Sequence, residues 1–165
     1  MQIKLLGVHN MSTLRTIETR EDKIRRIKQK FQNQTLDQLK GRASDIADIM
    51  TRQRSDDAEV ADQAYDDFYQ YGLSFDYVQP FTFEEQRAGY WRWQISWGGP
   101  GEEFRIYVDP VTDRVKEVDF YYTEDWGNCH TINLDRIHHL NQDKLVSNDL
   151  NEVFGAIDQL MEGRS

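Results

Sequence analysis

Apolar side chains in the first 54 residues recur every three or four positions, which predicts helices packed on one face. We expect two helices there, over residues 14–31 and 36–50. Ser12 is a candidate cap for the first, and Thr35 with Gln38 gives the second a capping-box pattern. The second helix has the more regular apolar seam: Leu36, Leu39, Ala43, Ile46 and Met50. Because such a seam packs on another helix, we expect a helical hairpin, with a homodimer through these two helices as a further possibility.

A third helix is predicted between Ser55, a candidate cap, and Gly72, a natural stop. Its apolar positions share one side: Val60, Ala64, Phe68 and Tyr71. Glu59, Asp62 and Asp66 share the far side. The spacing therefore predicts an amphipathic helix with a carboxylate outer face.

From residue 90 the apolar period changes to two, which predicts strands. We expect strands over residues 90–97, 104–108 and 118–122, joined by turns at 98–101 and 109–113. The apolar side of the first strand is strongly aromatic: Trp91, Trp93, Ile95 and Trp97. The alternation predicts a three-stranded antiparallel β-meander with one aromatic face, covered by helices.

A last helix is predicted over residues 147–163, where apolar positions again follow a helical spacing. Residues 73–89 have the character of a loop, and residues 123–146 predict no clear element. The fold class is therefore α+β: N-terminal helices, a three-stranded meander and a C-terminal helix. We expect a basic helical region at 1–54 and an acidic, aromatic α+β domain at 55–165.

Charge divides the chain at the same point. The first 54 residues hold 12 Lys/Arg and six Asp/Glu, whereas the stretch from Asp56 to Asp125 holds 17 Asp/Glu and five Lys/Arg. Of the 20 Phe, Trp and Tyr residues, 18 lie between Tyr65 and Trp126. An acidic, aromatic surface repels nucleic acid and attracts basic protein sites, so it favours a basic protein partner.

Length and cysteine content suggest a cytosolic protein. No apolar run of the 165 residues approaches the roughly 18 that a membrane span needs, and no signal peptide is evident. Cys129 is the single cysteine, which fits a reducing compartment. Met11 is a second plausible start, which would make residues 1–10 an upstream extension.

Several residue groups carry chemistry, but their spacing favours structural roles. Glu102 and Glu103 are adjacent on a strand and point to opposite faces, which is poor geometry for acid–base catalysis. The Gly98–Gly101 turn lacks the Lys-Ser/Thr of a phosphate loop. Cys129-His130 with His138-His139 matches no standard zinc spacing. The tryptophan row suits either a buried sheet face or a platform for a ligand. We therefore expect no enzymatic activity, no cofactor and no metal.

Two charged helix faces are the remaining candidates. Lys23, Arg26 and Lys30 form a basic face that suits nucleic acid, a dimer partner or plain solvent. Glu59, Asp62 and Asp66 form a row whose axial steps of about 4.5 and 6 Å loosely match phosphates about 3.4 Å apart along a DNA strand. The predicted partner-binding set adds nearby acids and aromatics to that row: Tyr69, Asp76, Tyr77, Glu84 and Glu85.

Residues 90–107 resemble a group of small proteins carried by phages, plasmids and integrative elements. These proteins share an aromatic strand, a Trp-Gly-Gly-Pro turn as at 97–100, a return strand and an acidic-aromatic third strand ending near Asp-Trp, as at 125–126. The resemblance covers about residues 70–127. It implies an accessory gene of a mobile element, and such elements often carry small acidic counter-defence proteins of the anti-restriction or anti-CRISPR kind.

Three functions follow as hypotheses. The first is a non-enzymatic inhibitor of a mobile element, a possible DNA mimic that presents its acidic surface to the basic nucleic-acid-binding site of a host defence complex or nuclease. The second is a nucleic-acid-binding or regulatory protein that uses the basic N-terminal helices. The third is an enzyme acting on a sugar or another small ligand, which would need a deep pocket and converging carboxylates.

Overall fold

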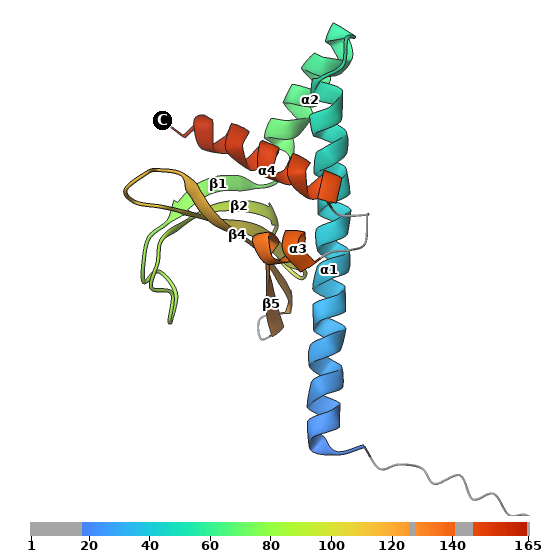
Figure 1. Ribbon diagram of the computed structural model, residues 1–165, viewed down its shortest axis with the longest axis vertical. Coiled ribbons are helices and arrows are strands. Elements are labelled where there is room, and N and C mark those ends of the chain that lie inside the picture. The colour runs from blue at the N-terminus through green and yellow to red at the C-terminus, as the bar shows by residue number, and fades with distance from the viewer. Residues whose placement is uncertain (1–17, 126–127, 141–146, 165) are drawn as a thin grey trace, which may run out of the picture.

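The computed structural model describes residues 18–125, 128–140 and 147–164, so the candidate cap Ser12 lies outside it. Four helices and five strands form an α+β fold (Figure 1). The helices are α1 (Arg20–Gln53), α2 (Ala58–Gln70), α3 (Leu134–Leu140) and α4 (Ser147–Glu162). The strands are β1 (Ser74–Val78), β2 (Tyr90–Ser96), β3 (Gly101–Val108), β4 (Val115–Asp125) and β5 (Asn128–Asn133).

The strands form one antiparallel sheet in the order β1-β2-β3-β4-β5. The predicted three-stranded meander is therefore wrong, because a strand joins the sheet at each edge. β1 lies within the predicted loop 73–89, where Phe75 stacks on Trp91 at a centroid separation of 5.3 Å. β5 lies in the segment without a clear pattern and pairs Ile132 with Phe120. Edge strands of five and six residues give only short alternations, which is why the sequence did not reveal them.

α1 is one helix of 34 residues, so the expected pair of N-terminal helices is wrong. Thr35, the expected cap of the second helix, is buried inside α1, and its hydroxyl donates to the Phe31 carbonyl at 2.8 Å. That bond satisfies the hydroxyl without ending the helix. The cap of α1 is Thr19, whose side chain accepts from the Asp22 amide while the Asp22 carboxylate accepts from the Thr19 amide.

The helices of the described residues lie on one face of the sheet (Figure 1), and the core lies between these helices and the sheet. Leu39 and Ile46 of α1 and Ile157 of α4 pack with Phe104 and Phe120, and all five are fully buried. The apolar seam predicted in 36–50 thus packs within the chain. In contrast, residues 20–30 of α1 are all exposed, because this part of the helix extends past the sheet (Figure 1).

A β-bulge changes which side chains share the faces of β2. Pairing shifts between Gln94, which lies opposite Glu103, and Ser96, which lies opposite Glu102. Trp91 and Trp93 keep the predicted apolar face, but Trp97 lies beyond the strand and is 69% exposed. The prediction that Trp97 continues the tryptophan row is therefore wrong, because the bulge and the glycine turn at residue 98 redirect the chain.

One buried ion pair joins α1 to the β2–β3 hairpin. Glu102 is 2% exposed, and its Oε2 accepts from Arg42 at 2.6 and 3.0 Å and from the Ser96 hydroxyl at 3.0 Å. A charge buried to this degree is tolerated only with such partners. The pair therefore fixes where the helix crosses the hairpin.

Candidate functional site

The carboxylate face predicted on the third helix is present on α2. The cap is Asp57 rather than Ser55, because its Oδ1 accepts from the amides of Glu59 and Val60 at 3.0 and 3.4 Å. Ala64 and Phe68 are buried. The opposite face is exposed and carries three acids and two tyrosines: Glu59, Asp62, Tyr65, Asp66 and Tyr69. We call these five residues the acid–tyrosine face.

Two acids near this face, Asp67 and Glu152, are bound to arginines of the chain itself. Asp67 accepts from Arg52 at 2.8 Å, and hydrogen bonds from Gln63 and Arg52 lower the pKa of its carboxyl. Glu152 accepts from Arg54 at 2.7 and 3.0 Å. By comparison, the three carboxylates of the acid–tyrosine face form no ion pair with any described residue. Their charge is therefore directed to solvent.

The other predicted partner-binding residues lie elsewhere. Asp76 and Tyr77 are on β1, and Glu84 and Glu85 are exposed on loop 79–89. Figure 1 shows α2 beside α1, whereas this loop hangs at the far end of β1. The predicted acids therefore do not form one continuous row. Asp76 is also bound to Arg92, so it is not an open charge.

The basic face predicted near the N-terminus lies on the extending part of α1. Lys23, Arg26 and Lys30 are all exposed. Arg26 forms an ion pair with Glu18 at 2.8 Å, and no described acid is bound to the two lysines. This face is open to solvent along one side of the helix.

The face of the sheet without helices holds a cavity of about 930 Å³, which we call the sheet cavity. Its rim comes from loop 79–89 and from the β2–β3 turn, including Trp97 and Gly98. Its floor consists of outward side chains of β2, β3 and β4: Tyr90, Arg92, Gln94, Glu103, Arg105, Tyr107 and Tyr121. A cavity of this size falls in the range of small-ligand sites.

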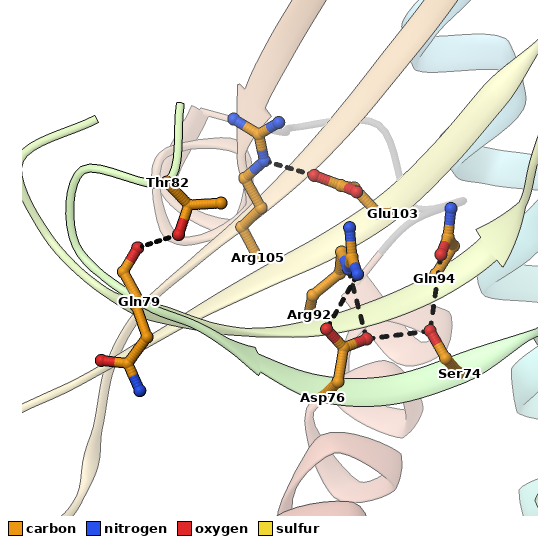
Figure 2. A network of polar contacts seen from close by, with 8 residues as sticks. All are labelled: Ser74, Asp76, Gln79, Thr82, Arg92, Gln94, Glu103 and Arg105. Atoms are coloured by element: carbon orange, nitrogen blue, oxygen red, sulfur yellow. Dashed lines mark hydrogen bonds and ion pairs between the residues drawn. The ribbon is translucent and has the colours of Figure 1, made fainter. Parts of the chain in front are cut away.

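Polar contacts hold the floor of the sheet cavity in place (Figure 2). Arg92 donates to both carboxylate oxygens of Asp76 at 2.8 and 3.3 Å, and Ser74 donates to Asp76 at 2.9 Å. On β3, Arg105 donates through Nε to Glu103 at 2.6 Å. These contacts fix two guanidinium groups on the open face.

Aromatic rings surround Arg105. Its guanidinium carbon lies 3.8 Å from the ring centroid of Tyr121 and 5.2 Å from that of Tyr90, which is cation–π geometry. Tyr90 is 1% exposed, and burial raises the pKa of its phenol to about 12. The open face of the sheet is thus partly buried, although none of the described helices covers it.

The remaining candidate catalytic and metal-binding residues do not come together in one site. Glu102 binds Arg42 on the covered side and Glu103 binds Arg105 on the open side, so the two carboxylates do not converge. Cys129 is exposed on β5. Within the described part of the chain, no three His, Cys, Asp or Glu residues come together to hold a metal ion, and no helix is long and apolar enough to cross a membrane.

The sequence did not reveal the sheet cavity. The polar positions of the alternating strands carry arginines and tyrosines, to which the sequence assigned no role. The recurring Tyr and Arg at 90, 92, 105, 107 and 121 were the available signal. The loop that deepens the cavity could not be placed without β1.

The chain matches no protein-family model, no curated protein and no solved structure. The resemblance of residues 90–107 to proteins of mobile elements therefore stays a prediction, and any assignment of function depends on the geometry.

Proposed function

We propose that this is a non-enzymatic binding protein whose acid–tyrosine face docks on a basic protein surface. The partner is the nucleic-acid-binding site of a host defence complex or nuclease, and the binding inhibits it. The observation that carries the proposal is the charge of Glu59, Asp62 and Asp66 on one exposed helix face, which no described cation of the chain neutralises, whereas nearby Asp67 and Glu152 are bound to arginines.

The geometry of α2 suits this role. The three carboxylates lie on one side of a helix capped at both ends, so their positions are fixed before binding. Such a row raises the association rate with a cationic site and competes with phosphates for it. Tyr65 and Tyr69 are 46% and 69% exposed and supply large rigid contact area, which is what anchors most protein interfaces.

The test is a DNA-cleavage assay with restriction and CRISPR nucleases of the host, run with the wild type and with the Glu59→Gln/Asp62→Asn/Asp66→Asn variant. Inhibition is expected for the wild type, with a steep loss as salt is raised. The triple variant should lose it. The matched control neutralises three exposed acids elsewhere, Asp37, Asp158 and Glu162, and should still inhibit. Equal inhibition by both triple variants would refute the docking face.

A second candidate function is nucleic-acid binding by the basic face of α1, favoured because residues 20–30 are all exposed. A gel shift with nonspecific DNA separates the two. DNA binding that disappears in the Lys23→Ala/Arg26→Ala/Lys30→Ala variant supports the second candidate. Absence of a shift at low salt supports the inhibitor.

A further inference from the structure

The sheet cavity has a binding chemistry of its own, separate from the acid–tyrosine face. Arg105 engages only its Nε, so both terminal nitrogens of its guanidinium lack an acceptor among the described residues. Figure 2 shows these two nitrogens pointing away from Glu103. The side chain is only 22% exposed. These two donors face the cavity, where an acceptor on a ligand can reach them.

Arg92 is a second arginine on this face with a donor that lacks an acceptor. It lies directly opposite Arg105 in the β2–β3 register, on the same face of the sheet. Like charges at directly opposed positions are destabilising. Asp76 binds the Nε and Nη2 of Arg92, which leaves Nη1 without an acceptor in the described part of the chain. Two fixed guanidinium groups with free donors are the arrangement that recognises a carboxylate.

Charge around the floor limits which anion fits. Four glutamates and three arginines of the open side line the cavity, and a fifth lining glutamate, Glu102, is bound to Arg42 on the covered side, so the surroundings are slightly acidic overall. A dianion such as phosphate meets more repulsion there than a monocarboxylate. Glu84, Glu85 and Glu124 are exposed at the rim and form no ion pair with described residues, so they suit a cationic group on the same ligand.

The rest of the lining suits an apolar or aromatic body. Tyr90, Tyr107 and Tyr121 form the floor around Arg105, and Phe83 and Trp97 lie at the rim. We propose that the sheet cavity binds a small zwitterion, an aromatic amino acid or a short peptide ending in one, with its carboxylate on Arg105 and Arg92 and its ammonium group among the rim glutamates.

The experiment is an NMR titration of the full chain that follows the Arg105 Nε–H resonance. Phenylalanine is expected to shift it saturably. Phenylalaninamide, which lacks the carboxylate, should bind at least ten-fold more weakly, and so should phenylacetate, which lacks the ammonium group. A Lys-Gly-Phe tripeptide that binds ten-fold tighter than phenylalanine identifies the peptide as the occupant, whereas equal or weaker binding identifies the free amino acid.

Variants test the assignment to Arg105. Arg105→Lys keeps the charge but removes the fork of donors, so phenylalanine should bind at least ten-fold more weakly. Arg114→Lys, at an exposed arginine in the β3–β4 turn, is the matched control and should bind as the wild type does. Three results would overturn the proposal: no saturable shift with phenylalanine or the tripeptide, equal binding of the amide, or inorganic phosphate binding as tightly as phenylalanine. These comparisons use wild-type protein, so they hold even if Arg105→Lys folds poorly.

Discussion

The two faces of the central sheet are built from alternate residues of the same strands, yet their chemistry is opposite. On the covered face, Trp93, Phe104 and Phe120 pack under α1 and α4 with at most 2% of their surface exposed. On the open face, Arg105 lies between Tyr90 and Tyr121, and Glu103 is bound to it. The first face excludes water with apolar groups, whereas the second carries charged and phenolic groups that line the sheet cavity.

The difference shows which face specifies the fold. Apolar burial on the covered side is favourable in itself, about 25 cal/mol per Å². Burying guanidinium and carboxylate groups is costly, and an ion pair at best offsets that cost. The open face lies under loop 79–89 and could have been apolar, but it carries Arg105 and Glu103 instead. It is therefore not optimised for stability. Its side chains are better explained by binding than by packing.

The largest effect on the free energy of unfolding is expected when an aromatic ring is removed from each face of β3 in turn. Phe104→Ala removes a fully buried ring from the covered face and should lower the free energy of unfolding by about 3 to 5 kcal/mol. Tyr107→Ala removes a half-buried ring from the open face and should cost only about 1 to 2 kcal/mol. Urea unfolding followed by circular dichroism measures both. Equal losses would mean that both faces act as core.

The second-largest effect is expected from a substitution that breaks the buried ion pair on the covered side. Arg42→Met keeps the aliphatic stem but leaves the Glu102 carboxylate, whose side chain is 1% exposed, without its cation. A stranded buried charge costs several kcal/mol, so we expect a loss of about 3 kcal/mol in urea unfolding. Adding Glu102→Gln should recover part of it. If the double variant is no more stable than the single one, the carboxylate charge is not the cause.

The covered face was predictable because its signal is strong and local. Strict alternation over Trp91, Trp93 and Ile95 and over Val118, Phe120 and Tyr122 indicated which side of each strand faces the helical core, and the structure confirms it. The C-terminal helix is confirmed for the same reason, with Leu150, Val153, Ile157 and Met161 buried. Apolar burial dominates there, and its period follows directly from backbone geometry.

The failures have separate physical causes. One continuous helix was interpreted as two because Thr35 has the residue type of a cap, whereas its hydroxyl bonds back to Phe31 within the helix. β1 and β5 were missed because edge strands bury less and alternate weakly. The sheet cavity needs β1 and its loop in place, and the contact of Arg92 with Asp76 depends on that pairing. Long-range register of this kind is not encoded in any local window.

A third prediction concerns alkaline pH and the open face. Burial raises the pKa of Tyr90 to about 12 from 10.0, so the native state keeps the phenol proton where the unfolded chain has lost it. The stability from this group is complete below pH 10 and is lost as pH rises through 12. Between pH 10 and pH 12, the free energy of unfolding of Tyr90→Phe should therefore fall by about 1 to 2 kcal/mol less than that of the wild type. Ultraviolet absorbance should show one fewer late-ionising tyrosine in the variant, and an unchanged absorbance titration would contradict the assignment.

The smallest expected effect tests the ion pair of the open face directly. In the Glu103→Gln/Arg105→Gln variant two neutral amides replace the pair, so neither member is left as a charge without its partner. Because exchanging a partly buried pair for neutral groups is close to balanced, we expect unfolding in urea to change by about 1 kcal/mol or less. The same variant should lose the carboxylate binding proposed for the sheet cavity. A loss of stability as large as that of Arg42→Met would instead show that Arg105 and Glu103 hold the sheet together as Arg42 and Glu102 do, and the contrast between the two faces would then fail.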